Sequence, residues 1–419
     1  MRIKLNQSHF ANSLPFVRGG RGWGRSTSPS PSLQRRGIIT FICGLVFLVI
    51  TGCATSTIFQ PLGTNISSPN GIAIDATANR LYLINSNSNV LYDWTQGSIQ
   101  ILDITDPLHP VLMNTTQTQS FSGEDVIDSN GRKLLYTTNR YSEQTTVTQD
   151  NLLIMNIDES SADFTTVSSV LTAKDPYGLF CCYPADRMWI ATGGNELDFI
   201  DLATQTVGSV NLLQPMSNGG VFTESQTSFI AVKGNQAFLQ RFNGGILILN
   251  LDTAADPTKN PIDYWIEDIN YPLGVATDST FLYVADQETI DGNWTPLLLV
   301  IDLSKLPALT DNALTQVKQR DIDGLVVNQI QVARNPQRVF LTSQYAFVTC
   351  DDSDDQGFVS VIDLATKTKI TDIAVGKEPF GMALYAPGGV EKYLYVGNVQ
   401  SNILSIIDIA SLTVAGTYP

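Results

Sequence analysis

Residues 394–408 read Leu-Tyr-Val-Gly-Asn-Val-Gln-Ser-Asn-Ile-Leu-Ser-Ile-Ile-Asp, and this stretch decides the fold. It contains two apolar runs, and each run ends in a short polar side chain, Asn398 or Asp408. Short runs of branched and aromatic residues that are bounded by turn residues are typical of β-strands. The stretch therefore predicts two consecutive strands of one sheet.

The first of these strands recurs seven times along the chain, each time with an aromatic residue at its second position. The seven aromatic residues are Tyr82, Tyr136, Trp189, Phe238, Tyr283, Phe347 and Tyr395. Tyr82 and Tyr395 are 313 residues apart, so the six intervals average about 52 residues. Repetition at such a period indicates seven supersecondary units, each of which buries its faces only against its neighbours.

The strand that follows the aromatic strand in every unit ends in Asp or Asn. These residues are Asp103, Asn156, Asp201, Asn250, Asp302, Asp363 and Asp408. Side chains of this type at a strand end accept hydrogen bonds from the backbone N–H groups of the following turn. We interpret all seven as structural, because a catalytic site is built from unlike groups that converge once.

A further strand precedes each aromatic strand and often opens with Pro-x-Gly, at 69–71, 176–178, 272–274 and 379–381. Together these phrases resemble the YVTN-type β-propeller repeat, most closely in the last unit, and residues 99–107 resemble the related LVIVD repeat. The resemblance implies an all-β fold, a seven-bladed β-propeller of four-stranded antiparallel blades whose closed ring removes exposed sheet edges. It is specific for the fold and nearly silent on chemistry.

Three units depart from the Pro-x-Gly phrase. Unit two lacks a proline before Gly123, and unit four has Asn218-Gly219-Gly220 in its place. Unit six has Arg338 where the glycine is expected. The sequence therefore defines the strand register least well in units four and six.

An apolar run at 37–52 follows the basic pair Arg35-Arg36 and leads into Cys53. A basic segment, an apolar stretch of about 15 residues and small residues before a cleavage point make an export signal, and the stretch is too short to span a bilayer comfortably. The pattern Ile50-Thr51-Gly52-Cys53 resembles a bacterial lipoprotein signal peptide. This resemblance implies cleavage before Cys53, a lipid on its thiol and a mature protein tethered outside the cytoplasm. An uncleaved signal anchor is the alternative.

On this basis the chain divides into a leader with a lipoprotein signal peptide (1–52), a lipidated linker (53–65) and the β-propeller (66–419). A translation start near Leu33 would give a more compact signal than Met1 does. Ala54, directly after the cysteine, resembles signals that are routed to the outer membrane. We therefore expect a lipid-anchored protein of the bacterial cell envelope, on the periplasmic side of the outer membrane or at the cell surface.

Charge separates the leader from the rest of the chain. Residues 1–52 carry seven Lys or Arg and no acidic residue, which leaves 18 basic against 40 acidic side chains, a formal charge of −22, in residues 53–419. Nucleic acid is excluded as an expected partner, because its binding relies on Lys and Arg that neutralise phosphates. We expect a monomeric domain that contacts the membrane only through its N-terminal lipid.

In each unit the aromatic strand is the second strand and the strand that ends in Asp or Asn is the third. The connections between these two strands are unequal in length, and four of them are extended: 86–97, 140–151, 287–296 and 351–357. In propellers these connections share one face, so four long ones suggest a recognition surface. They carry the aromatic residues Tyr92, Trp94, Tyr141 and Trp294. We expect Asp351, Asp352, Asp354 and Asp355 at their rim, where a negative field favours basic partners. The alternative is that one or more of the aromatic residues pack back on a blade.

The acidic run that begins at Asp352 is also a candidate metal-binding site. Its spacing Asp-x-Asp-x-Gln-Gly, with Asp363 at the twelfth place, partly imitates a calcium loop. Such loops are followed by a helix, whereas 358–363 reads as a strand and Asp363 already belongs to the repeat. A solvated turn is therefore the alternative to calcium, and we expect no other cofactor.

Residues that would support an enzyme are scarce. His109 is the only histidine after residue 52, and it lies between prolines in a turn, which excludes copper and haem propeller enzymes that need several histidine ligands. Strand alternation is expected to send Cys181 and Cys182 to opposite faces, where packing is favoured over a vicinal disulfide. The sequence therefore predicts no catalytic residue.

Three functions remain open from the sequence. The favoured one is a binding protein for a protein or a surface polymer. A lactonase-like propeller hydrolase is the enzyme alternative, but it would need His, Arg and Glu to converge at the channel mouth. A passive wall or assembly scaffold would differ from a binding protein by lacking an aromatic cluster on the long-loop face.

Replacing the expected lipidated cysteine tests the anchor. Cys53→Ser should release the protein from membranes or leave it unprocessed, because no other segment is apolar enough to retain it. Fractionation of the cell envelope followed by immunoblotting measures this. A shortened Cys53→Ser protein that still sediments with membranes would show that the anchor lies elsewhere.

Overall fold

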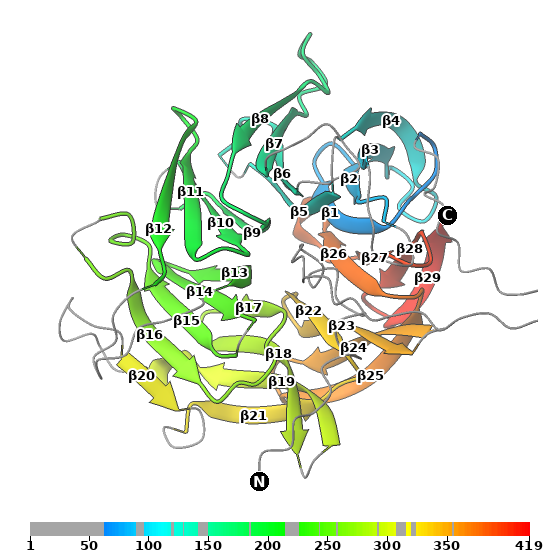
Figure 1. Cartoon of the computed structure of the whole chain (residues 1–419). Coiled ribbons are helices and arrows are strands. Elements are labelled where there is room, and N and C mark those ends of the chain that lie inside the picture. The colour runs from blue at the N-terminus through cyan, green and yellow to red at the C-terminus, as the bar shows by residue number, and fades with distance from the viewer. Residues whose placement is uncertain are drawn as a thin grey trace, which may run out of the picture.

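The computed structural model describes residues 63–88, 96–118, 121–128, 130–140, 150–183, 186–213, 226–242, 244–256, 259–290, 293–306, 316–319, 324–353 and 356–419. These residues form seven sheets arranged as blades around a central axis (Figure 1). Within each blade the strands follow one another in chain order from the axis to the rim. The structure is the all-β, seven-bladed β-propeller that the sequence predicts.

Each blade has four antiparallel strands that are consecutive in the sheet. Blades 1 to 4 are β1 (Pro69–Asp75), β2 (Arg80–Asn85), β3 (Ser98–Asp103) and β4 (Val111–Gln117); β5 (Phe121–Ile127), β6 (Leu134–Arg140), β7 (Asn151–Asn156) and β8 (Val167–Leu171); β9 (Pro176–Cys181), β10 (Arg187–Thr192), β11 (Glu196–Asp201) and β12 (Thr206–Asn211); and β13 (Thr227–Lys233), β14 (Gln236–Arg241), β15 (Ile246–Asn250) and β16 (Ile262–Glu267). Blades 5 to 7 are β17 (Val275–Thr277), β18 (Phe281–Ile290), β19 (Asn293–Asp302) and β21 (Val326–Gln331); β22 (Pro336–Leu341), β23 (Tyr345–Ser353), β24 (Gln356–Asp363) and β25 (Thr368–Val375); and β26 (Pro379–Tyr385), β27 (Tyr393–Asn398), β28 (Ile403–Asp408) and β29 (Thr413–Tyr418).

One extra strand and two short turns complete the described structure. β20 (Gln316–Gln319) leaves blade 5 between β19 and β21 and pairs in parallel with β16 at the rim of blade 4. The turns are the 3-10 helices η1 (Leu303–Lys305) and η2 (Pro387–Gly389). Within the described ranges, no helix is long and apolar enough to cross a membrane.

The repeated aromatic residues form the core between blades. All seven, from Tyr82 in blade 1 to Tyr395 in blade 7, are at most 1% exposed. They belong to clusters of buried apolar side chains that lie between neighbouring blades: Leu83 and Tyr395, for example, share one cluster between blades 1 and 7. Each blade therefore buries its two sheet faces against its neighbours, as the repeat requires.

The seven Asx residues at the ends of the third strands have the structural role that the sequence predicts. In each blade the side-chain oxygen accepts a hydrogen bond from a backbone N–H two or three residues later, as from Asp103 Oδ1 to the N–H of Thr105 (2.7 Å) and from Asp363 Oδ1 to that of Thr366 (2.7 Å). These bonds form the first turn of the chain after each third strand.

The ring closes where blade 1 meets blade 7. Tyr395 Oη donates to the carbonyl oxygen of Pro107 (2.6 Å), and Tyr385 Oη donates to Asn79 Oδ1 (2.7 Å). No strand is exchanged between these two blades among the described residues. Residues 53–62 of the predicted linker lie outside the described residues.

The chain just before β1 already contacts the propeller. The carbonyl oxygens of Gly63 and Asn65 accept hydrogen bonds from Gln100 Nε2 at 2.9 and 3.1 Å. Residues 63–65, assigned to the linker from the sequence, therefore lie against blade 1.

The strand register corrects the sequence reading in two units. In blade 1, Pro69 stands opposite Asn85 on the neighbouring strand. The equivalent residue in blade 4 is Thr227, opposite Arg241, so Asn218-Gly219-Gly220 does not replace Pro-x-Gly. In blade 2 the equivalent is Ser122, which places residue 124, not Gly123, at the glycine position. The sequence does not reveal the register of these two inner strands, because they have neither the proline nor the glycine of the Pro-x-Gly phrase.

Cys181 and Cys182 also differ from expectation. The two residues are joined as a vicinal disulfide, so the expectation of two separately packed thiols is wrong. They lie at the end of β9, where the chain leaves the sheet, so strict strand alternation does not continue through the pair. Cys350 is a buried free thiol.

The close approach of the inner strands leads to a testable prediction for Gly381. A Cβ at Gly381 would lie 2.5 Å from the carbonyl oxygen of Asn70 in blade 1, whereas a Cβ at Gly416 on the outer strand meets nothing nearer than 3.5 Å. Gly381→Ala should lower the free energy of unfolding by about 1 to 3 kcal/mol, because backbone must shift to admit the methyl group. Gly416→Ala, the control, should be neutral or stabilising by up to about 1 kcal/mol. Denaturant titration of both variants measures this, and equal midpoints would contradict the tight inner packing.

Candidate functional site

The loop face is the side of the ring that carries the connections between second and third strands and the entries to the first strands. In blade 5 this connection is an extended hairpin, in which β18 and β19 stay paired out to Ile290 and Asn293. Trp294 stands on this extension, opposite Thr289, and is 41% exposed. The expected location of Trp294 on the loop face agrees with the structure.

A second aromatic residue meets Trp294 on the loop face. Tyr271, in the entry loop of blade 5, is 47% exposed, and its ring packs edge to face on Trp294 with centroids 4.9 Å apart. The backbone N–H of Tyr271 donates to Asp286 Oδ1 (2.8 Å), which ties the entry loop to β18. Two large aromatic side chains are therefore presented together to solvent. Tyr271 was not predicted from the sequence, because it lies in an entry loop and not in one of the long connections between second and third strands, although both kinds of loop share that face.

Asp351 and Asp352 lie at the end of β23 and are half-buried. The hairpin that carries them is paired to Ser353 and Gln356, and Asn335 Nδ2 donates to the carbonyl oxygen of Asp351 (2.9 Å). This places the two acidic residues on the loop face in blade 6, next to blade 5.

Cys53, Tyr92, Trp94, Tyr141, Asp354 and Asp355 lie outside the described residues. Their roles stay predictions.

The calcium-like spacing spans a strand and not a loop. β24 separates Asp352 at one end of the hairpin from Asp363 at the other. Asp363 Oδ1 is occupied by the N–H and hydroxyl of Thr366. Asp363 is therefore engaged in its own turn, and calcium binding by the acidic run that begins at Asp352 stays a prediction.

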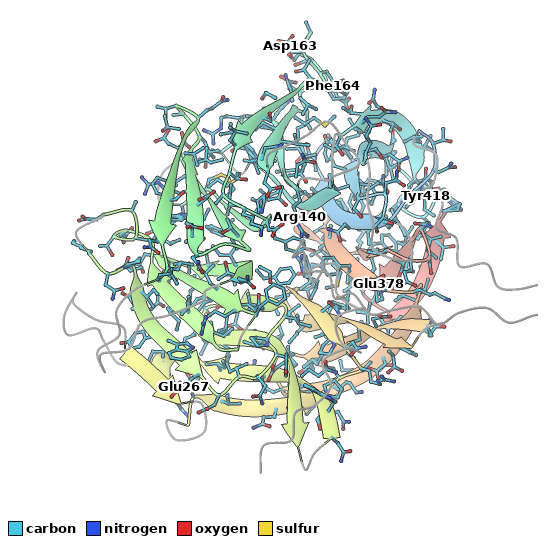
Figure 2. All side chains as sticks on the ribbon, viewed as in Figure 1. Arg140, Asp163, Phe164, Glu267, Glu378 and Tyr418 are labelled. Carbon is cyan, nitrogen blue, oxygen red and sulfur yellow. A yellow bond between two sulfur atoms is a disulfide. The ribbon has the colours of Figure 1, made fainter. Side chains whose placement is uncertain are left out.

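The channel mouth on the loop face is lined by buried charged groups. Arg140, at the end of β6, contacts Asp175 in the entry to β9 (3.3 Å), and Asp175 donates its backbone N–H to Asp150 Oδ2 (2.8 Å). Glu378 precedes β26 and is almost fully buried. Figure 2 shows Arg140 and Glu378 at the inner edge of the ring.

Below the mouth, aromatic rings from three blades fill the axis. Tyr177 packs edge to face on Phe229 (5.2 Å) and on Phe380 (6.2 Å), and Phe229 and Phe380 are 6.2 Å apart. The guanidinium carbon of Arg338 lies 4.6 Å from the centre of the Phe229 ring and 5.4 Å from that of Phe380. Burial lowers the pKa of Arg338 to about 9, so it remains charged at neutral pH.

Histidine is absent from the described part of this mouth. His109 lies in the turn between β3 and β4, on the opposite face, where its Nδ1 is 2.9 Å from Asp106 Oδ2. An Arg and a Glu are thus present without an imidazole beside them.

Asp128 and the Cys181–Cys182 pair are close enough to share a metal ion. The two sulfur atoms are joined to each other, and the Asp128 carboxylate accepts hydrogen bonds from Arg132 Nε and from Tyr136 Oη (3.2 Å). This group is therefore explained as a structural contact between blades 2 and 3.

Substituting an exposed tryptophan and a buried one tests whether Trp294 is a surface residue or a core residue. Trp294→Ala should change the free energy of unfolding by less than about 1 kcal/mol, because much of its ring already faces water. Trp189→Ala, which empties a fully buried site, should cost about 3 to 5 kcal/mol. Denaturant titration compares the two. Similar large losses would show that Trp294 is a core residue.

Comparison with known proteins supports the fold and leaves the chemistry open. Residues 390–418 match the family model of the LVIVD repeat, and this segment contains β27, β28 and β29. No curated protein gives a significant sequence match. Among solved structures, the computationally designed Ika8 protein is similar with a TM-score of 0.52 and 11% identity, over 84% of this chain and 87% of that chain. At this identity the likeness shows the fold alone.

Proposed function

We propose that this LVIVD-repeat β-propeller is a lipid-anchored binding protein of the bacterial cell envelope, which captures a protein or a surface polymer on its loop face. The observation that carries the proposal is the exposed Tyr271–Trp294 pair on the extended hairpin of blade 5. Exposed aromatic residues are costly in water and are enriched where proteins bind partners.

The surroundings of the pair support the same face. Asp351 and Asp352 belong to the next blade, and their hairpin is also extended. The charge of −22 over residues 53–419 favours a partner with basic groups, since opposite potentials steer encounter and reject like-charged competitors. On the opposite face, each connection between third and fourth strands begins with an Asx hydrogen bond, as at Asp103 and Asp363.

The lipid anchor rests on the sequence pattern around Cys53. A lipid at residue 53 and a propeller whose described contacts begin at Gly63 would leave about ten residues between membrane and ring. Such a linker reaches at most about 35 Å when fully extended, so the propeller would work close to the membrane surface.

A lactonase-like hydrolase has weaker support. Arg140 and Glu378 lie at the channel mouth, but the histidine that such a site would need lies on the opposite face. A passive scaffold would not require the solvent-exposed aromatic pair.

Capture from the organism's own envelope extract tests the proposal. The full chain and its Tyr271→Ala and Trp294→Ala variants serve as bait, and Val390→Ala is the matched control, because Val390 is 58% exposed in the turn between β26 and β27 on the opposite face. Loss of a central aromatic contact should weaken partner affinity by about 1 to 3 kcal/mol, that is about 5- to 150-fold, while Val390→Ala should leave it unchanged.

Identical capture by all four proteins, with unchanged stability, would remove the loop face as the binding surface. Selective loss of capture by Val390→Ala would move the site to the opposite face.

A further inference from the structure

The face of the ring opposite the loop face carries a group of three potential metal ligands between blades 2 and 3. Asp128 begins the connection between β5 and β6, and Cys181 and Cys182 lie where β9 leads into its connection to β10. One oxygen atom of Asp128 and the two sulfur atoms all lie within 4.8 Å of one another. Two blades contribute to this group, so ring formation brings the three side chains together.

The Asp128 carboxylate is held in one orientation by its neighbours. Its side chain is fully buried, and its Oδ2 accepts hydrogen bonds from Arg132 Nε and from the Tyr136 hydroxyl group (3.2 Å). Its Oδ1 accepts from the backbone N–H of Asn130 (2.6 Å) and lies 3.9 Å from Sγ of Cys182. Carboxylates that bind metal ions are oriented by such outer hydrogen bonds. The contacts of Oδ2 therefore leave Oδ1 directed toward the cysteine pair.

The disulfide between Cys181 and Cys182 controls whether the sulfur atoms can act as ligands. In the oxidised protein they are bonded to each other. Both residues are half-buried, so part of the pair is open to a reductant. A dithiol reduces such a bond by exchange: the S–S bond takes up two electrons and two protons to give two thiols, while the dithiol is oxidised to a disulfide. Reduction therefore produces two neighbouring thiol ligands beside Asp128.

The spacing of the three side chains suits one thiophilic metal ion. Zinc binds thiolate sulfur at about 2.3 Å and carboxylate oxygen at about 2.1 Å in tetrahedral geometry, which requires a sulfur-to-oxygen separation of roughly 3.6 Å. The 3.9 Å between Cys182 Sγ and Asp128 Oδ1 is close to this value. Two sulfur ligands need a separation of roughly 3.8 Å, which rotation about the Cα–Cβ bonds can supply once the S–S bond is broken.

Charge favours a divalent cation in this group. Two thiolates and the Asp128 carboxylate would carry three negative charges, and Asp186 adds a fourth through its ion pair with Arg132 (3.0 Å). Arg132, which pairs with both carboxylates, supplies one positive charge. Negative charge is therefore left for a metal ion to neutralise. Two sulfur donors select a thiophilic ion such as Zn²⁺ or Cd²⁺ over Mg²⁺ and Ca²⁺, which prefer oxygen ligands.

We propose that Cys181, Cys182 and Asp128 form a redox-gated binding site for a thiophilic divalent metal ion. The disulfide closes the site in the oxidised protein. After reduction, the two thiols lose their protons to water as the metal ion binds, and both sulfur atoms and Asp128 Oδ1 coordinate it. Three protein ligands leave a fourth tetrahedral position open to water.

Cadmium binding to the full-length wild-type protein in its two redox states tests the proposal without any substitution. Iodoacetamide first blocks the free thiols of the oxidised protein, and a phosphine then reduces the disulfide. The reduced protein should bind one equivalent of Cd²⁺ at least tenfold more tightly than the oxidised protein does. Binding should produce the ultraviolet absorption band of cadmium–thiolate bonds, and excess Mg²⁺ should not displace the ion.

Two substitutions and a matched control locate the site. Cys182→Ser should abolish binding of this equivalent. Asp128→Asn should retain the absorption band but weaken Cd²⁺ binding by at least tenfold, because the two thiolates remain without their oxygen partner. Cys350→Ser, the control, changes a buried cysteine on β23 in the same way and should leave binding unchanged.

Equal Cd²⁺ binding by the oxidised and the reduced wild-type protein, or none by either, would overturn the proposal. Full binding by Cys182→Ser, or wild-type affinity in Asp128→Asn, would also overturn it, because each removes a ligand of the site. These measurements do not involve the loop face, so this proposal and capture of a partner fail separately.

Discussion

Burial of each sheet face against the next blade is the interaction on which the whole structure depends. No blade can hide its aromatic second strand alone, and the apolar clusters between neighbours supply the core. Closure between blades 7 and 1 completes the last of these interfaces, supported by the Tyr385 and Tyr395 hydroxyl groups. A ring closed by packing, with no strand exchanged among the described residues, derives its stability from all seven interfaces together.

Close approach of the inner strands is the second constraint, and it follows from the first. Tight packing between blades draws the first strands together at the axis, where backbone of one blade fills the space that a Cβ of its neighbour would need. At the glycine position of the first strands, glycine occurs in blades 1, 3, 5 and 7, as Gly71, Gly178, Gly274 and Gly381. Because seven is odd, blades 7 and 1 both have glycine at this position, Gly381 and Gly71, and both residues line a cavity of about 60 Å³.

The two faces of the ring are built differently. On one face, the same Asx hydrogen bond forms the first turn after every third strand, so these Asx side chains have a structural role. On the loop face, connection length varies from blade to blade, and the long β18–β19 hairpin carries an aromatic pair that the fold does not need. The recognition surface that we propose lies on that face, where loops can differ in length while the blades keep their structure.

The sequence by itself determined the repeat, the blade number and the structural role of the Asx residues, because these depend on local periodicity and on bonds within a few residues. It also indicated Trp294 on the loop face, since loop length is visible in the chain. It misplaced the inner strands of blades 2 and 4, where no proline or glycine marks the register, and it separated Cys181 from Cys182 by assuming that strand alternation continues past β9. Only the tertiary structure decided that Tyr271 meets Trp294, that Arg338 stacks on Phe229 and Phe380, and that a polar cavity remains at the axis. These contacts join residues that are distant in the sequence, either in one blade or in different blades, and no local pattern encodes them.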